Sequence, residues 1–169
     1  FQGNSEQELT DLAASAAPMF DALPVVSPVE MTSKLSERNA LWAARRGLYT
    51  TVAGNRPTGT NALLEDVVVP VDVLGATCRD LTALFDAHGY QDSVIFGHAK
   101  DGNIHFMLNE QFRDAKQLVR YRDFTEEMVQ LILNADGSLK AEHGTGRIMA
   151  PFVRRQFGDE LFEVMREIK

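Results

Sequence analysis

The chain has 169 residues, of which 44% are apolar and 24% are charged, a composition that is typical of one folded domain and excludes wholesale disorder. It carries 17 Lys and Arg against 24 Asp and Glu, a net charge of −7, and has no basic stripe that could bind nucleic-acid phosphates. Its only cysteine, Cys78, cannot form an internal disulfide, and no apolar run approaches the roughly 20 residues that span a bilayer. We therefore expect a cytoplasmic protein with no nucleic-acid partner and no transmembrane segment.

Both ends of the chain are interpreted as truncation points. Residues 1–3 (Phe-Gln-Gly) are typical of the remnant of a protease-cleavable purification tag, and the last predicted helix stops without a cap signal. We expect a fragment of a longer protein, with an N-terminal helical segment and connector over residues 4–34 and the main domain over residues 35–169.

Helical signals come first along the chain. The capping box Ser5-Glu6-Gln7-Glu8 precedes apolar residues at helical spacing and predicts a helix that Pro18 kinks or ends. A second helix is expected to begin near Thr32 or Ser33 and to end at Gly47.

After a polar loop rich in Gly and Pro (residues 53–61), strand and helix signals alternate. The predicted elements are a strand at 67–69, a helix at 74–85, strands at 94–96 and 104–107, and helices at 125–133 and 152–168. This order, β-α-β-β-α, is that of a split βαβ unit. We predict an α+β fold in which an antiparallel sheet carries helices on one face, as a ferredoxin-like layer.

The two central strands flank Asp101-Gly102, which is a strong signal for a two-residue type I′ hairpin turn. If these two residues form the turn, His98 pairs directly with His105, with Cβ atoms roughly 4.5–5.5 Å apart on one face. Two neutral imidazoles at that distance suit a metal ion. A register slip of one residue would put them on opposite faces. The alternative interpretation is a hydrogen-bonded surface pair.

The segment Glu142-His143-Gly144-Thr145-Gly146-Arg147 adds a carboxylate and an imidazole on a Gly-rich turn, where the backbone can approach a ligand closely. Two histidines and one carboxylate with open coordination positions are typical of a catalytic metal site. In the alternative interpretation, Glu142 caps the following helix and His143 is a solvated loop residue.

Two long motifs carry a family resemblance. The segments 97–105 (GHAKDGNIH) and 141–146 (AEHGTG) resemble the C-terminal substrate domain of FAD-linked oxidases, as do segments 41–45 (LWAAR) and 65–71 (EDVVVPV). This family contains D-lactate dehydrogenases, the glycolate oxidase FAD subunit and D-2-hydroxyglutarate dehydrogenase. The resemblance covers roughly residues 35–169. It is greatest to large bacterial proteins that join an FAD dehydrogenase to a ferredoxin-type iron–sulfur region.

The resemblance implies a role for each matching residue. His98, His105 and Glu142 would hold a divalent metal, zinc in related enzymes, that binds the carboxylate and hydroxyl of a small D-2-hydroxy acid. His143 would be the general base that takes the hydroxyl proton while the hydride passes to FAD. Arg45 would form a bidentate pair with a substrate carboxylate.

Some relatives carry a lysine before the strand Asp for a distal substrate carboxylate, whereas this chain has Leu63-Leu64-Glu65 there. Arg56 or Thr58 in the polar loop could substitute for that lysine. The resemblance also implies that the turn with Glu142, Gly144 and Arg147 contacts FAD.

Two features of an FAD and iron–sulfur enzyme are missing from the chain: a Gly-rich phosphate loop and a cysteine cluster. We therefore expect FAD to be bound mostly by the FAD-binding domain of the parent chain, and any iron–sulfur cluster to lie elsewhere in that protein. The isolated chain is expected to be inactive. Two other functions stay open, a metal-dependent hydrolase and a non-catalytic ligand-binding module.

Overall fold

The structure is a computed structural model that describes residues 1–169. The chain forms two compact units, residues 1–52 and 53–169. The expected domain boundary after residue 34 stays a prediction.

The first unit holds helix α1 (Glu6–Asp21) and all but the last two residues of helix α2 (Leu35–Gly54). The predicted cap of α1 is confirmed, because Ser5 Oγ accepts a hydrogen bond of 3.1 Å from the backbone N–H of Glu8. Helix α1 continues through Pro18, which near the end of a helix removes only a single backbone donor.

Helix α2 differs from its prediction at both ends. It begins after Thr32 and Ser33, at Leu35, and it passes through Gly47 to end at Gly54. A glycine inside a helix costs only about 1 kcal/mol relative to alanine, which does not by itself end the helix.

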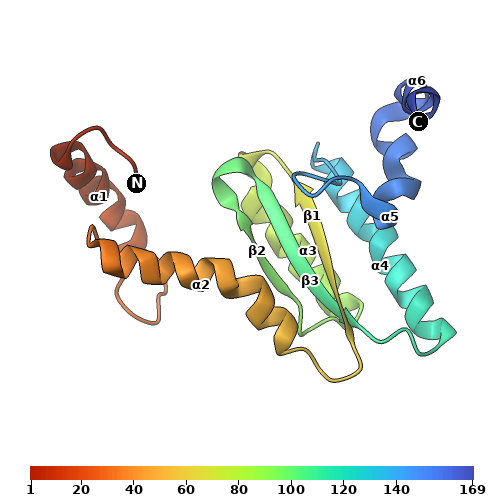
Figure 1. The fold of residues 1–169 in the computed structure, drawn as a ribbon, viewed down its shortest axis with the longest axis horizontal. Helices are drawn as coiled ribbons and strands as arrows, with labels where there is room; N and C mark the ends of the chain where they lie inside the picture. Colours follow the sequence, from red (N-terminus) through yellow and green to blue (C-terminus); the bar gives the residue numbers. More distant parts are fainter. The chain divides into compact units, whose positions relative to one another are not determined.

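The second unit is built on a three-stranded sheet with the order β1-β3-β2 (Figure 1). The strands are β1 (Asn61–Val68), β2 (Val94–His98) and β3 (Asn103–Glu110). Both outer strands are antiparallel to β3, so β1 and β2 run parallel with β3 between them. The predicted split βαβ arrangement and the α+β fold class are confirmed.

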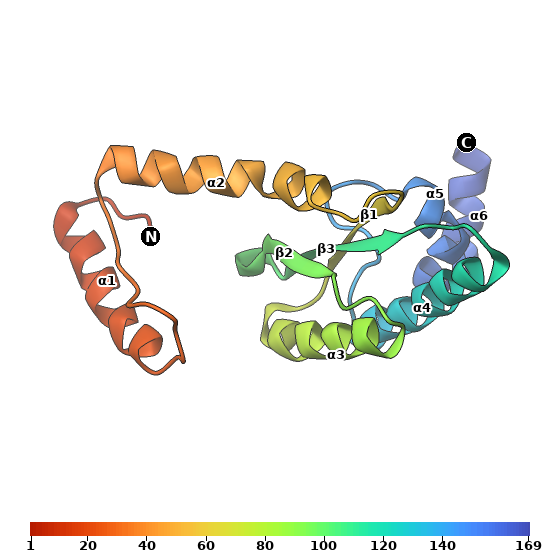
Figure 2. The ribbon, with the colours of Figure 1, turned by 90° about the horizontal axis from the view of Figure 1, so that it is seen from below.

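Two long helices, α3 (Leu74–Ala87) and α4 (Ala115–Asn134), cover one face of this sheet, as Figure 2 shows. Helix α4 is longer than predicted because Asp114 caps it, accepting a hydrogen bond of 2.9 Å from the backbone N–H of Gln117. The chain then returns past the sheet to α5 (Gly146–Met149) and α6 (Val153–Ile168). No helix is both long and apolar enough to cross a membrane.

The core lies between the sheet and these helices. Alternate strand residues face it, since successive side chains of a strand point to opposite faces. Its buried members from the strands, α3 and α4 are Val67, Ile104, Phe106, Leu108, Leu81, Phe85, Phe124, Met128, Val129 and Ile132. The opposite face carries the polar residues Asp66, Asn103 and His105, which are also buried.

The hairpin between β2 and β3 differs from the predicted type I′ turn. His98 pairs with Asn103 and Phe96 pairs with His105, so the register is shifted by two residues. Residues 99–102 form the loop, in which only Gly102 adopts a left-handed conformation (φ 71°). Because the shift is an even number, His98 and His105 still lie on the same face, as diagonal rather than direct neighbours.

Candidate metal centre

Three predicted metal ligands converge at one end of the sheet. His98 ends β2, His105 lies in β3, and Glu142 comes from the segment before α5. One oxygen of Glu142, Oε1, lies 3.0 Å from Nε2 of His98 and 3.1 Å from Nε2 of His105. The two imidazole rings have centroids 5.4 Å apart. The structure thus brings together two ring nitrogens and a carboxylate oxygen, a donor set suited to a divalent metal such as zinc.

The predicted base, His143, lies directly beside these ligands. Its ring stacks on that of His105, with centroids 4.9 Å apart and an interplanar angle of 6°. His143 Nε2 lies 3.8 Å from Glu142 Oε1, and the side chain is 45% exposed. The imidazole is therefore accessible to a small molecule that approaches the metal ligands.

A residue outside the predicted site, Asp66 of β1, organises this cluster. It is fully buried, and its Oδ2 accepts hydrogen bonds from three successive backbone N–H groups, those of Ala141 (3.2 Å), Glu142 (2.8 Å) and His143 (2.8 Å). Its Oδ1 accepts a hydrogen bond of 2.7 Å from Nδ2 of Asn103. Two adjacent carboxylates, Glu65 and Asp66, between the apolar residues of β1 are the sequence signal that could have identified it.

Electrostatics keep Asp66 charged. Burial by itself raises the pKa of this carboxyl, but the hydrogen bonds from the His143 backbone, the Asn103 amide and the Glu142 backbone outweigh it. The net pKa of Asp66 is lowered from its ordinary value.

The surroundings of His105 favour the neutral form of its imidazole. Burial lowers the pKa of its imidazole, and the nearby carboxylates of Asp66 and Glu142 only partly oppose this effect. Its Nδ1 lies 3.3 Å from Asp66 Oδ1, without a well-aligned hydrogen bond, while Nε2 faces Glu142. A carboxylate behind a ligating histidine is a common feature of metal sites, where it orients the ring.

Asp66 also lies near both His105 and His143, so a second triad of donors exists. Its oxygens are, however, already used: Oδ2 accepts three hydrogen bonds, and Oδ1 accepts one and contacts His105. In the triad of His98, His105 and Glu142, Glu142 Oε1 is hydrogen-bonded to Nε2 of His98 and lies 3.1 Å from Nε2 of His105, and the side chains of His98 and Glu142 are half-exposed. The predicted triad is therefore more accessible to a ligand than the buried carboxylate of Asp66.

The predicted contact residues lie in different places. Gly144 and Arg147 follow Glu142 closely, and both are exposed. Gly144 has a positive φ of 70°, with no heavy atom within 4 Å of the place where a Cβ would lie, so its backbone is open to a ligand. Arg45 lies in α2, in the first unit, and is half-buried. Its role stays a prediction.

The structure does not bring Arg56 and Thr58 to the histidines. Both lie in the exposed loop before β1, next to the end of the sheet where Asn61 pairs with Glu110. That end is about 17 Å along the strand from Asp66. Arg56 also uses its guanidinium locally, donating from Nε to the backbone oxygen of Thr60 (3.0 Å).

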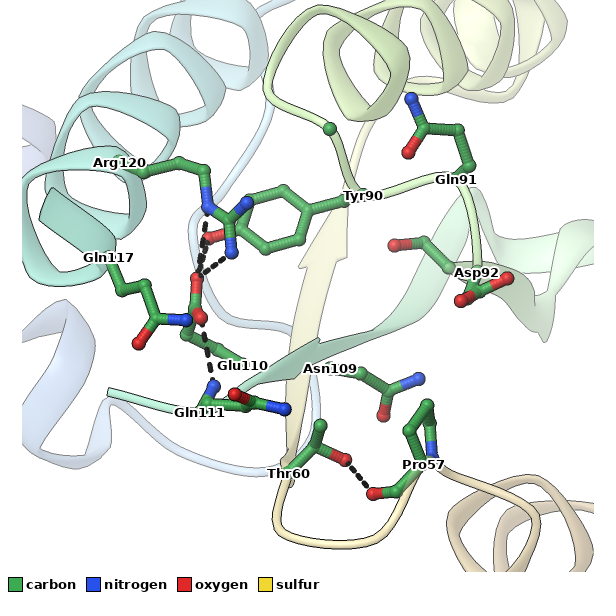
Figure 3. A pocket seen from close by; sticks show the side chains of 12 residues that line it. Pro57, Thr60, Tyr90, Gln91, Asp92, Asn109, Glu110, Gln111, Gln117 and Arg120 are labelled. Atoms are coloured by element: carbon green, nitrogen blue, oxygen red, sulfur yellow. Dashed lines mark hydrogen bonds and ion pairs between the residues drawn. The ribbon is translucent and has the colours of Figure 1, made fainter. Parts of the chain in front are cut away.

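A second polar cluster lies at that far end of the sheet (Figure 3), where it lines a cavity of about 310 Å³. Glu110 is buried there, and its Oε2 accepts hydrogen bonds from Tyr90 Oη (2.8 Å) and from Arg120 Nη2 (2.7 Å). Its other oxygen accepts from the backbone N–H of Gln111 (2.8 Å). Because the charges of Glu110 and Arg120 are paired with each other, we assign this cluster a structural role: it links β3 to α4.

Known proteins are similar in sequence to this chain. The sequence profile of the family "FAD linked oxidases, C-terminal domain" matches residues 1–169. The chain is similar to the mitochondrial D-lactate dehydrogenase [cytochrome] of Kluyveromyces lactis, with 32% identity over 76% of this chain and 22% of that protein. It is also similar to glycolate oxidase subunit GlcD of Bacillus subtilis (28% identity, over 83% and 29%).

A third relative is the D-2-hydroxyglutarate dehydrogenase of Xanthomonas citri, with 28% identity over 99% of this chain and 34% of that protein. The chain thus spans about a third or less of the length of these relatives. The resemblance carried by the histidine and Gly-rich motifs is confirmed, and the family match extends beyond it to the N-terminal 34 residues. The chain belongs to the family of FAD-linked oxidase C-terminal domains.

Proposed function

We propose that this chain is the metal- and substrate-binding part of an FAD-dependent dehydrogenase that oxidises a small 2-hydroxy acid to the 2-oxo acid. The observation that carries the proposal is the convergence of His98, His105 and Glu142 next to the exposed imidazole of His143. The relatives' names support the substrate class, because lactate, glycolate and 2-hydroxyglutarate all carry a hydroxyl on the carbon next to a carboxylate.

In this proposal, His98, His105 and Glu142 hold a divalent metal, for which zinc is our candidate. A bound divalent ion supplies a Lewis acid that lowers the pKa of the substrate hydroxyl. His143 then accepts the hydroxyl proton at Nε2, the ring nitrogen on the side of Glu142. Its Nδ1 lies 3.9 Å from the Asp66 carboxylate, which stabilises the imidazolium that forms.

FAD would be bound mostly by the FAD-binding domain of the parent protein and would accept the hydride from the substrate. The open backbone at Gly144 and the exposed Arg147 are the residues of this chain that we propose to contact it. The isolated chain is then inactive as an oxidoreductase. An iron–sulfur cluster in the parent protein would need cysteines other than Cys78, the only one present here.

The first test is the zinc content and zinc affinity of the purified chain. We expect about one zinc ion per chain, lost in the double variant His98→Ala, His105→Ala. The matched control is His88→Ala, because His88 lies outside the cluster, 3.2 Å from Glu127. Equal zinc content in the wild type and the double variant would overturn the proposed site.

The second test separates the alternatives. The full-length parent should reduce a flavin-linked electron acceptor with D-lactate, glycolate or D-2-hydroxyglutarate, and the double histidine variant should not. Turnover by the isolated chain in a panel of hydrolase substrates would favour a metal-dependent hydrolase. Zinc binding without turnover in either assay would favour a non-catalytic ligand-binding module.

A further inference from the structure

We propose that Asp66 is a positioning residue that holds Glu142 and His143 over the histidines of the sheet. The inference rests on the proposed function, since it concerns how the metal ligands and the base of that site are placed. Asp66 touches neither the substrate nor the metal in this proposal. It acts through the backbone of the segment that carries the two functional side chains.

The first observation is the path of that segment around the edge of the sheet. Ser138 pairs with Val68 of the edge strand β1, through backbone hydrogen bonds of 2.8 and 3.0 Å. The next residue, Leu139, is buried in the core on the helix-covered face. By Glu142, the chain has reached the opposite face, where the histidines lie. The segment therefore crosses β1 within a few residues.

The second observation is that two neighbouring acidic residues hold this crossing from both faces of β1. Glu65 points to the helix-covered face, and its Oε2 accepts a hydrogen bond of 2.7 Å from Nζ of Lys140, with both side chains largely buried. Asp66 points to the other face and accepts the backbone N–H groups of residues 141–143. Three donors on one carboxylate oxygen fix the conformation of all three residues at once.

The third observation is that the Asp66 carboxylate is itself fixed in rotation. Asn103 Nδ2 donates to its Oδ1 and also to the backbone oxygen of Val67 (3.1 Å). With Oδ1 held by Asn103, only Oδ2 can face the segment. The pair of Asp66 and Asn103 therefore determines where Glu142 Oε1 meets the two imidazoles.

This arrangement predicts why asparagine cannot replace Asp66. An amide has one acceptor and one donor side, so Asp66→Asn must direct its NH₂ either at the Asn103 amide or at the three backbone N–H groups. Either choice sets two donors against each other. The double variant Asp66→Asn, Asn103→Asp restores a donor and acceptor pair between the two side chains and leaves the amide oxygen at position 66 free to accept from the segment. It also removes the donor to the backbone oxygen of Val67.

The experiment uses the 169-residue chain and two readouts, zinc affinity by competition with a chromophoric chelator and hydrogen exchange of the backbone amides of residues 141–143 without metal. Asp66→Asn should weaken zinc binding by about 10–100-fold, the usual effect of losing a partner that orients metal ligands, and should speed exchange of these amides. The double variant should recover part of both properties, because it regains the pair between the two side chains but not the donor to the Val67 oxygen. The matched control is Glu110→Gln, a buried carboxylate at the other end of the sheet, which should leave zinc affinity unchanged.

The outcomes are distinguishable. A wild-type chain that binds no zinc but protects these amides overturns the proposed metal site and leaves the backbone anchor supported. Unchanged zinc affinity and exchange in Asp66→Asn overturn the positioning role. A loss of affinity in Glu110→Gln equal to that in Asp66→Asn also overturns it, because the effect would then be general destabilisation. Slower exchange of these amides in Asp66→Asn than in the wild type overturns the hydrogen-bond explanation.

Discussion

The turn that joins β2 to β3 should tolerate no side chain at Gly102. This residue has a φ of 71°, and a Cβ placed there would lie 1.9 Å from the backbone oxygen of Val69. The oxygen of Gly102 also accepts a hydrogen bond of 3.0 Å from the Val69 N–H. The two backbones therefore approach each other closely, and Gly102→Ala must separate them.

The size of the effect follows from two contributions. A left-handed conformation costs an L-residue roughly 1–2 kcal/mol. A normal C···O contact is about 3.3 Å, so the turn and the Val69 carbonyl must move apart by about 1.4 Å, which weakens a hydrogen bond with a net contribution of about 1 kcal/mol. Together we expect Gly102→Ala to lower the free energy of unfolding by about 2–3 kcal/mol.

Urea unfolding followed by far-UV circular dichroism is the appropriate assay, because the only tryptophan, Trp42, lies in α2 of the first unit. The matched control is Gly144→Ala, since Gly144 has nearly the same φ (70°) but no atom within 4 Å of the added Cβ. We expect the control to lose only the conformational cost of about 1–2 kcal/mol. Equal losses in the two variants would refute the argument from close approach.

Two further predictions concern charge and catalysis. Burial raises the pKa of Glu110, but the hydrogen bonds from Arg120, Gln111 and Tyr90 outweigh it and bring the pKa below its ordinary value of 4.5. The charged carboxylate of Glu110 therefore stabilises the folded protein above pH 4.5, and this stabilisation is lost as the pH falls through the folded-state pKa. Glu110→Gln should lower the free energy of unfolding at pH 7 by about 1–3 kcal/mol. The variant should also lose less stability than the wild type as the pH falls below 4.5. Urea unfolding at a series of pH values measures both effects, and the same pH dependence in the two proteins would contradict this prediction. In the full-length enzyme, His143→Gln should lower kcat by about 10²–10⁴-fold in a steady-state assay while zinc content is kept, and an unchanged kcat would exclude His143 as the base.

Much of the site could be predicted from the sequence because the side-chain period of a strand is two. The predicted pairing of β2 with β3 was wrong by two residues, because the strands are joined by a four-residue loop and not by a two-residue turn. An even shift keeps His98 and His105 on one face, so the conclusion survived an incorrect pairing. A shift of one residue would have separated the rings.

What could not be predicted depends on contacts between distant segments. Asp66 is separated by 77 residues from His143, and nothing in the local pattern indicates that its carboxylate accepts three backbone donors there. The long N-terminal part of α4 was missed for a local reason, because residues 115–124 carry several polar side chains and the Asp114 cap was not recognised. The placement of Arg56 and Thr58 required the position of the loop before β1.

The single carboxylate that anchors consecutive residues has a consequence for substrate range. Glu142 and His143 share one backbone anchor, which fixes the spacing between their side chains. In the proposed site, this would set the distance between the metal ligand and the proton acceptor whatever the length of the acid. Residues that the anchor does not hold would then recognise the rest of the substrate.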